Sequence, residues 1–292
     1  MNKFLVLLFA VLFLIPVDAQ WWDGKKFNWK NSEELVPGIR YAHIAEKSPR
    51  LMNIWVMRVD LNQKFRFHTV HKAAEYGQPI TTHLHRKLVI HTKRQKTVDF
   101  MTEHRKKGID MVAAFNGSPW APWDRIPSPY ASRLGLLISD GELISPVIPG
   151  RPSFIVWKNG KVDLRAISPE EKTDDIQLAV TGFATVLDKG KTGGQKKGLA
   201  PRTGYGLSAD RRYFYIVVID GRQPDFSMGS TTHEVGCILF YLGADDGVNM
   251  DGGGSSSFVI FDRKSQKPRM LNHQPGGSMR GVGSSLGISI AE

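Results

Sequence analysis

Residues 213–219 read Tyr-Phe-Tyr-Ile-Val-Val-Ile and run directly into Asp220-Gly-Arg222. A continuous run of aromatic and β-branched residues predicts a strand that is buried on both faces. Further along, Thr231-Thr-His-Glu234 has the pattern of a capping box, in which the threonine hydroxyl and the glutamate carboxylate satisfy amides of the first helical turn. Apolar residues follow at helical spacing as far as Gly243, which is placed to end the helix.

A second short strand is predicted over residues 247–250, and it leads into Asp251-Gly-Gly-Gly-Ser-Ser-Ser257. Strand, helix and strand in this order predict a right-handed crossover between parallel strands. The strand ends then share one edge of the sheet, with Asp220 and Asp251 roughly 5–10 Å apart, depending on whether another strand lies between them. We therefore expect a single α/β (mixed α+β) domain with a central mixed sheet, helices packed on it and this crossover at its C-terminal end.

Two carboxylates at such a separation suit the hydrolysis of a glycosidic bond. The alternative for each aspartate is an Asx-type turn with the glycine that follows it. Ordering three consecutive glycines costs conformational entropy, which indicates a functional turn. We expect the backbone amides of this turn to form a nest for a phosphate or a developing oxyanion, and they belong to Gly252, Gly253, Gly254 and Ser255.

Arg202 lies in Pro201-Arg-Thr-Gly204, next to the glycine-rich turn in the expected fold. An arginine in this place suits bidentate contact with a phosphate or carboxylate, and a structural ion pair with Asp220 or Asp251 is the competing explanation. The nine histidines and single cysteine form no metal-binding pattern. No metal and no cofactor are therefore predicted, although a calcium ion held by Asp, Asn and backbone oxygens would leave no such pattern.

The N-terminal residues 1–19 have the features of a cleaved secretory signal: a basic start, an apolar stretch and small residues near Ala19. An uncleaved N-terminal anchor is the alternative. We expect an exported protein, periplasmic or extracellular, with residues 20–40 as an N-terminal strap, residues 41–292 as one domain and no later membrane span. In an exported protein the net charge of +11 favours anionic glycans or phosphate-bearing polymers over nucleic acid as partners. The oligomeric state is left open.

Taken in order, the segments 201–206, 218–222, 227–231, 242–244 and 248–256 resemble the phosphodiester glycosidase family. Ala113-Ala-Phe-Asn-Gly117 looks like that family's Asn-Gly strand end, and Arg280-Gly-Val-Gly283 looks like its closing arginine segment. The resemblance extends over roughly residues 40–290. It implies a mixed α/β domain that hydrolyses the bond between a sugar and a phosphate or related anionic group, similar to an N-acetylglucosamine-1-phosphodiester glycosidase.

These observations together predict an exported glycoside hydrolase with Asp251 as nucleophile or base and Asp220 as its acid partner. The predicted substrate-binding residues are Arg202, Arg280 and the amides of residues 252–255 for the anionic leaving group, Asn116 for a sugar hydroxyl, and Gly117, Thr203 and Arg222. Two other functions fit the same features. One is a non-catalytic cell-surface module that binds anionic glycan through exposed Trp120 and Trp123, and the other is a metal-dependent phosphodiesterase.

Overall fold

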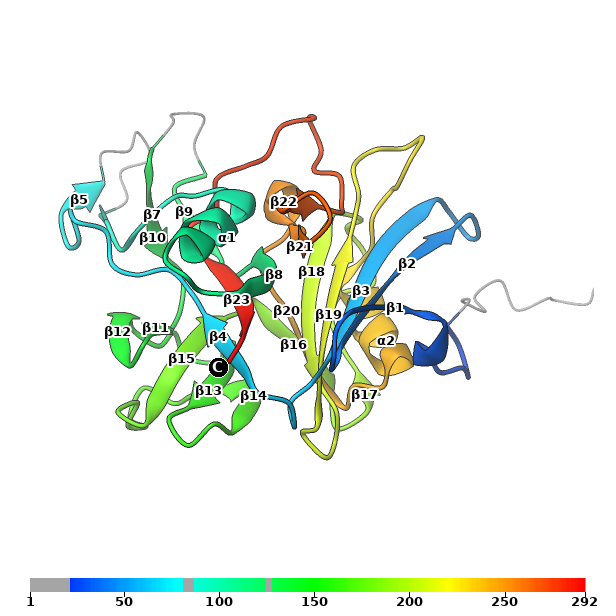
Figure 1. Cartoon of the computed structure of the whole chain (residues 1–292), viewed down its shortest axis with the longest axis horizontal. Coiled ribbons are helices and arrows are strands. Elements are labelled where there is room, and N and C mark those ends of the chain that lie inside the picture. Colours follow the sequence, from blue (N-terminus) through cyan, green and yellow to red (C-terminus); the bar gives the residue numbers. More distant parts are fainter. Residues whose placement is uncertain (1–21, 81–86, 124–127, 292) are drawn as a thin grey trace, which may run out of the picture.

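The computed structural model describes residues 22–80, 87–123 and 128–291, so the predicted signal segment lies outside the described residues. Over these ranges the chain forms five sheets, in which all neighbouring strands are antiparallel, and two α-helices (Figure 1). The protein is mostly β, and the predicted mixed α/β class is wrong. No helix in the described ranges has the length and apolar character needed to cross a membrane.

The largest sheet has eight strands and positions the C-terminal motifs (Figure 1). Its order is β1 (Glu33–Val36), β2 (Ile39–Glu46), β3 (Met52–Asp60), β19 (Tyr213–Ile219), β18 (Arg202–Leu207), β20 (Asp246–Asn249), β16 (Ala184–Asp188) and β17 (Lys191–Thr192). The expected strap therefore contributes the edge strand β1, and it also contains the 3₁₀ turn η1 (Trp29–Asn31).

The second sheet faces the first, and smaller sheets flank it. Its order is β22 (Lys267–Met270), β21 (Phe258–Asp262), β8 (Met111–Asn116), β23 (Ser285–Ile290) and β4 (Phe65–His68). A third sheet has the order β12 (Glu142–Ser145), β11 (Leu137–Ser139), β15 (Ile176–Thr181), β13 (Pro152–Trp157) and β14 (Val162–Ala166). The remaining sheets are β7 (Thr92–Lys93), β10 (Tyr130–Arg133) and β9 (Trp120–Ala121), and the pair β5 (Pro79–Ile80) and β6 (Leu88–Val89).

The apolar run of β19 is buried on both faces, as predicted. Tyr215, Val217 and Ile219 pack in one core cluster together with the apolar face of helix α2 (Thr232–Leu242). The alternate residues Ile216 and Val218 belong to the other cluster, which fills the space between the two large sheets. Successive side chains of a strand point to opposite faces of the sheet. A strand that lies between two apolar layers therefore carries apolar side chains on both faces.

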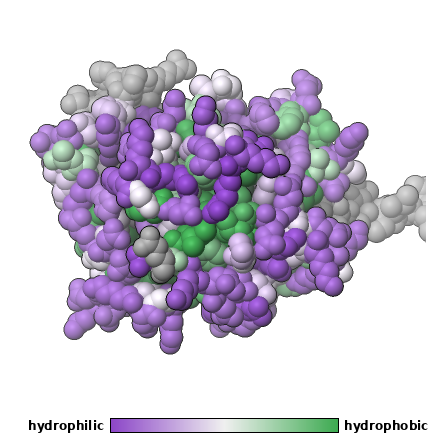
Figure 2. Space-filling model, in the orientation of Figure 1, coloured by the Kyte–Doolittle hydropathy of each residue, from purple (hydrophilic) through white to green (hydrophobic). Residues whose placement is uncertain are grey.

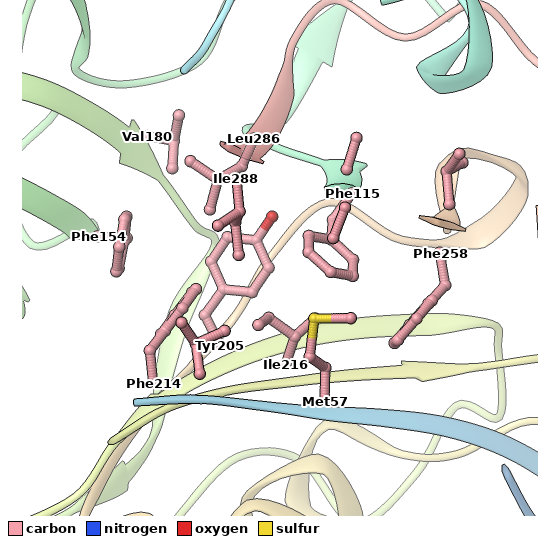
Figure 3. Packing of buried hydrophobic residues seen from close by; sticks show 14 of the residues in the cluster. Met57, Phe115, Phe154, Val180, Tyr205, Phe214, Ile216, Phe258, Leu286 and Ile288 are labelled. Atoms are coloured by element: carbon pink, nitrogen blue, oxygen red, sulfur yellow. The ribbon is translucent and has the colours of Figure 1, made fainter. Parts of the chain in front are cut away.

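The interior between the sheets is packed with aromatic and aliphatic side chains. Figure 3 shows Tyr205 of β18 among Phe154, Phe214 and Ile288, so that all three of the larger sheets meet around its ring. Polar residues dominate the molecular surface seen in the orientation of Figure 1, and an apolar area lies near its middle (Figure 2). The Tyr205 hydroxyl donates to the backbone carbonyl of Asn116 at 2.8 Å, which ties β18 to the end of β8.

Both ends of α2 have the predicted local structure. The Thr231 hydroxyl accepts a hydrogen bond from the Glu234 amide, and the Glu234 carboxylate accepts one from the Thr231 amide. Gly243 ends the helix in the left-handed conformation, with φ of 111°. Helix α1 (Thr97–Lys106) packs on β8 of the second sheet.

The connection from β19 through α2 to β20 differs from a crossover between neighbouring strands. β18 lies between β19 and β20 and pairs antiparallel with both of them, so β19 and β20 run in the same direction without touching. Their carboxyl ends therefore share one edge of the sheet, on either side of the first residues of β18. Two interstrand spacings separate them, or about 10 Å.

Candidate active site

Three strand ends meet at this edge, one of them from the second sheet. Asp220 follows β19, and Asp251 follows β20 in the turn that contains η2 (Gly253–Ser255). The end of β8 reaches this turn, because the Asn116 side-chain amide donates to the Asp251 carbonyl at 2.7 Å and the Asp251 amide donates to the Gly117 carbonyl at 3.3 Å. The structure thus brings most of the predicted site residues around the 251–257 turn.

Asp251 is a buried carboxylate with unused hydrogen-bonding capacity. Its residue is 7 % exposed, and burial raises the pKa of the carboxyl to about 6. Hydrogen bonds from the Ser255 hydroxyl and the Gly252 amide, together with the positive charges of Arg133 and Arg280, oppose that rise in pKa. Oδ2 is buried and has no hydrogen-bond partner among the described residues, so one hydrogen-bonding position of this carboxylate is unfilled.

Arg133 is the main member of the site that the sequence did not indicate. It is 3 % exposed, one of its terminal nitrogens donates to the Ser118 carbonyl, and both Nε and Nη1 are buried without partners. Burial lowers the pKa of Arg133 to about 9, and the negative charge of Asp251 opposes that fall. An alanine at Gly283 would place Cβ 2.0 Å from Nη1, so the glycine makes room for the guanidinium.

A signal for Arg133 is weak in the sequence. It ends the short strand β10, and nothing in its local sequence distinguishes it from the many other arginines of a basic chain. Charged residues are almost never fully buried unless they are paired, so only tertiary burial identifies it as a site residue. The nearest indication of this site in the sequence is the closing segment 280–283, which contains Gly283.

Asp220 is completely buried, and its carboxylate organises the neighbouring backbone. Oδ1 accepts hydrogen bonds from the Asn272 side chain at 3.2 Å and from the His273 amide at 2.8 Å. Burial raises the pKa of Asp220 to about 6, whereas these two hydrogen bonds lower it. The same Asn272 amide also donates to the Ser256 carbonyl, so Asp220 is connected to the 251–257 turn through one side chain.

Asp220→Asn is expected to stabilise the protein above pH 6 and to have no effect at about pH 4. The asparagine oxygen can accept both hydrogen bonds, and the buried charge is gone. Because the folded-state pKa of Asp220 is raised from 3.8 to about 6, wild-type stability falls as pH rises through this interval. The gain of the variant at pH 8 should reach up to roughly 3 kcal/mol. Urea unfolding of both proteins at pH 4 and pH 8 measures it; equal differences at the two pH values would contradict the burial argument.

Asn116 and Thr203 bond to each other and to the turn. The Asn116 side-chain oxygen accepts from the Thr203 hydroxyl at 2.7 Å and from the Ser257 amide at 2.9 Å. Both residues are 0 % exposed. Gly117 lies against Ser284, whose carbonyl accepts from its amide. In this arrangement Asn116 fixes the position of the Asp251 turn, and its proposed contact with a sugar hydroxyl stays a prediction.

The triple-glycine turn uses part of the predicted amide nest internally. The Gly253 amide donates to the Pro201 carbonyl at 2.8 Å, the Ser255 amide to the Gly252 carbonyl, and the Gly252 amide to the Asp251 carboxylate. The absence of side chains on the glycines instead allows the Arg280 guanidinium to approach the backbone of the turn closely. An added Cβ on Gly254 would lie 2.8 Å from the central guanidinium carbon of Arg280, so this arginine packs directly on the turn.

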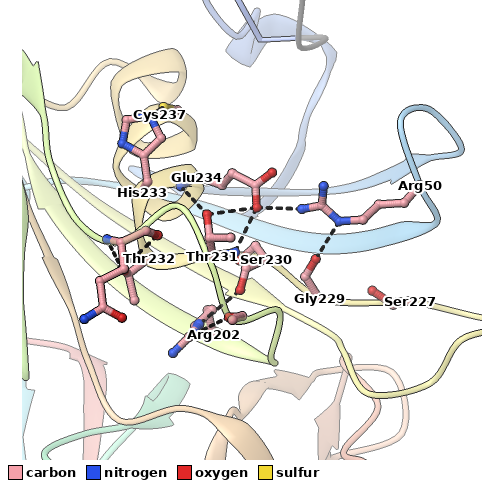
Figure 4. Close-up of polar contacts among 12 residues, drawn as sticks. Arg50, Arg202, Ser227, Gly229, Ser230, Thr231, Thr232, His233, Glu234 and Cys237 are labelled. Carbon is pink, nitrogen blue, oxygen red and sulfur yellow. Dashed lines mark hydrogen bonds and ion pairs between the residues drawn. The ribbon is translucent and has the colours of Figure 1, made fainter. Parts of the chain in front are cut away.

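Arg202 and Arg222 complete a positive rim around the turn. Arg202 donates to the carbonyls of Ser230 and Gly198, and it makes neither of the ion pairs considered from sequence. Figure 4 shows Arg202 and Arg50 tied to the same segment, residues 229–234, which leads into α2. Burial and the nearby charge of Arg222 lower the pKa of Arg202. The exposed Arg222 side chain lies beside Gly253.

The charges at this site are unbalanced. The arginine rim consists of Arg133, Arg202, Arg222 and Arg280. Among the described residues, none of these four forms an ion pair with a carboxylate. Within the described part of the chain, Asp251 is the carboxylate whose charge acts on Arg133. Arginines without counter-ions around one carboxylate form a site for an anion, since guanidinium groups match phosphate and carboxylate geometry.

The two tryptophans expected to be exposed differ. Trp120 is 2 % exposed and lies under the Arg94 guanidinium, with 4.4 Å between that group and the ring centre, so the expectation is wrong for this residue. Trp123 is 58 % exposed, as expected. In the part of the chain that the structure describes, no group of three or more His, Cys, Asp or Glu side chains is placed to hold a metal ion.

Known structures share this fold. The catalytic domain of zebrafish N-acetylglucosamine-1-phosphodiester alpha-N-acetylglucosaminidase, auto-inhibited by its pro-peptide, is similar with a TM-score of 0.61 and 17 % identity, over 89 % of this chain and 86 % of that one. A hypothetical protein from Synechocystis has a TM-score of 0.59 and 12 % identity, over 88 % of this chain and 63 % of its own length. A "Putative exported protein" from Burkholderia pseudomallei has a TM-score of 0.58 and 14 % identity, over 82 % and 74 %.

At these identities the similarities show a shared fold. No curated protein matches the chain in sequence. The sequence model of one family does match, the one described as phosphodiester glycosidase, and the match runs from residue 85 to residue 289. It includes the Asn-Gly end of β8, the first residues of β18, both aspartates and the triple-glycine turn. The chain belongs to the phosphodiester glycosidase family.

Proposed function

We propose that this protein is an exported hydrolase that cleaves a sugar from a phosphodiester-linked or otherwise anionic glycoconjugate. The observation that carries the proposal is the Asp251 carboxylate, with one oxygen that has no hydrogen-bond partner, among arginines that form no ion pair in the described chain. A glycosidic phosphodiester offers both complements: an electrophilic anomeric carbon for the carboxylate or its activated water, and a negative leaving group for the arginines. Family membership supports the same reaction class.

In the proposed reaction water adds its oxygen to the anomeric carbon, and the bond between this carbon and the phosphate oxygen breaks. Asp251 acts as nucleophile, or as base that takes the water proton, and the products are the free sugar and a phosphomonoester. Arg280 and Arg222 stabilise the charge that the departing phosphate gains. Because the second pKa of a phosphomonoester is about 6, the leaving group needs little protonation near neutral pH. The hydrogen-bonding role of the Asp220 carboxylate is consistent with a reaction that needs no strong acid.

Export is part of the proposal. It draws on the signal-like composition of residues 1–19, and one protein of similar fold carries the description exported. Periplasmic extract and culture medium of a bacterium expressing the full chain, probed for the processed protein, test it directly. Protein that stays unprocessed in the cytoplasm would argue against export without bearing on the chemistry.

Hydrolysis in ¹⁸O water identifies the bond that breaks. A panel of methyl sugar-1-phosphodiesters first provides a cleaved compound, and N-acetylglucosamine is the first sugar to include. We expect the label at C1 of the released sugar and none in the phosphomonoester, measured by mass spectrometry. Label in the phosphate would show P–O cleavage and favour the phosphodiesterase alternative, for which chelator should also remove activity. Tight binding without any product would favour the non-catalytic glycan-binding module.

A further inference from the structure

A basic cavity adjoins the proposed site and has no assigned role. It has a volume of about 590 Å³ and is bounded by residues 70–73, residues 93–96, one face of α1 and Gly281. Its lining includes only two carboxylates, Asp99 and Glu103, against five basic side chains, which are Lys72, Lys93, Arg94, Lys96 and Lys107. A cavity of this size holds a ligand of several sugar or polyol units.

Most of these basic groups are available to a ligand. Lys72 is ion-paired with Glu142 at 2.9 Å. For the other four, no ion pair exists within the described parts of the chain, and Lys93, Lys96 and Lys107 are exposed. Unpaired cations lining a concavity raise the local concentration of anions more than the same charges on a flat surface do.

Arg94 connects the cavity with the arginine rim. Its guanidinium donates to the Gly281 carbonyl at 3.2 Å and to the Ser128 carbonyl at 2.8 Å, which fixes it between the two. The positive charge of Arg280 contributes to lowering the pKa of Arg94, so the two groups are electrostatic neighbours. Gly281 lines the cavity, and Arg280, the residue before it, packs on Gly254 of the catalytic turn. A chain leaving the turn past Arg280 would therefore enter this cavity.

We propose that the cavity binds the part of the substrate beyond the scissile phosphate, and that this aglycone is a polyanionic glycan or polyol chain with further negative groups along it. The proposal rests on the proposed function, because it takes Arg280 as the contact of the leaving phosphate. Repeated phosphate or carboxylate groups would lie against Arg94 first and the lysines next. A compact neutral aglycone would leave four cations facing an empty cavity.

Binding of labelled probes tests the cavity without requiring catalysis. The variant is K93Q/K96Q/K107Q, and the matched control is K161Q/K191Q/K197Q, which removes the same charge from exposed lysines that do not line the cavity. The probes are a fluorescent glycerol-phosphate oligomer, a fluorescent oligogalacturonate and a neutral malto-oligosaccharide, followed by anisotropy. We expect about tenfold weaker binding of the anionic probe by the cavity variant and less than twofold change in the control.

The two anionic probes distinguish phosphate-bearing from carboxylate-bearing chains. Preferential binding of either probe supports the proposal that the cavity binds a polyanionic chain. The proposal is overturned if the cavity variant binds both anionic probes as wild type does, or if the control loses as much. Hydrolysis of the small methyl phosphodiester is followed in the same proteins and should keep its kcat/KM. If wild type itself does not hydrolyse the methyl phosphodiester, the proposed function is contradicted. The probe-binding result then still tests whether the cavity binds polyanionic chains.

Discussion

Asp251→Asn is expected to reduce turnover of a methyl sugar-1-phosphodiester about a thousandfold or more, while the melting temperature stays within a few degrees of wild type. Asparagine keeps the shape and one oxygen, but it can neither attack the anomeric carbon nor take a proton from water. The small stability effect follows from the surroundings of Asp251. Its charged form is disfavoured by burial, as the pKa of about 6 shows, so removing the charge relieves a cost while the hydrogen bonds rearrange.

The measurement is kcat and kcat/KM for the variant beside Asp225→Asn, which makes the same chemical change at an exposed aspartate in the loop after β19. The control should keep wild-type activity. In wild type, kcat/KM should fall on the acid side near the pKa of about 6 as Asp251 becomes protonated. An Asp251→Asn protein with wild-type turnover would reject the assignment, and a protein that loses activity only because it unfolds would be recognised from its melting curve.

Asn116→Ala is expected to cost about 3–5 kcal/mol of the free energy of unfolding, since three buried groups lose their partner at once. They are the Thr203 hydroxyl, the Ser257 amide and the Asp251 carbonyl. Two of them lie at the two ends of the 251–257 turn and the third lies on β18, so a local shift of one loop cannot supply new partners for all three. A loss of this size is a large part of the total stability of a typical domain. Activity should fall as well, because the Asp251 turn is no longer fixed.

Thr203→Val provides the graded comparison. It removes one of the three hydrogen bonds and leaves the Asn116 oxygen bonded to Ser257, so a loss of about 1 kcal/mol is expected. Urea unfolding of both variants measures the ratio. If Asn116→Ala unfolds like wild type but raises KM, the residue binds a sugar hydroxyl after all, and its role in fixing the turn would have to be abandoned.

The resemblance to the phosphodiester glycosidase family is specific because several short motifs occur together and in the same order. Single elements such as Asp-Gly or Gly-Gly-Gly-Ser are common turns, and each has a plain structural explanation. The structure shows why they occur together. The 251–257 turn is held by Asn116 from β8, by the Pro201 carbonyl beside β18 and by Asn272, which also binds Asp220. Motifs that are distant in sequence serve one turn.

Local chemistry determined the elements that the sequence predicted correctly. The apolar run of residues 213–219, the capping box at Thr231 and the glycine at 243 each specify structure through neighbours within a few residues. The aspartates after the two strands could be located for the same reason, because a strand end is marked by the residues next to it. These features required no knowledge of the rest of the chain.

Only the tertiary structure decided how these elements are arranged. Antiparallel pairing of short strands depends on partners far away in the sequence and leaves little local pattern, so the mostly β class and the place of β18 between β19 and β20 were not predicted. Burial decided the rest of the site. Arg133 and Trp120 look like surface residues in the sequence, and they became interior groups because distant segments, including Gly283, close over them.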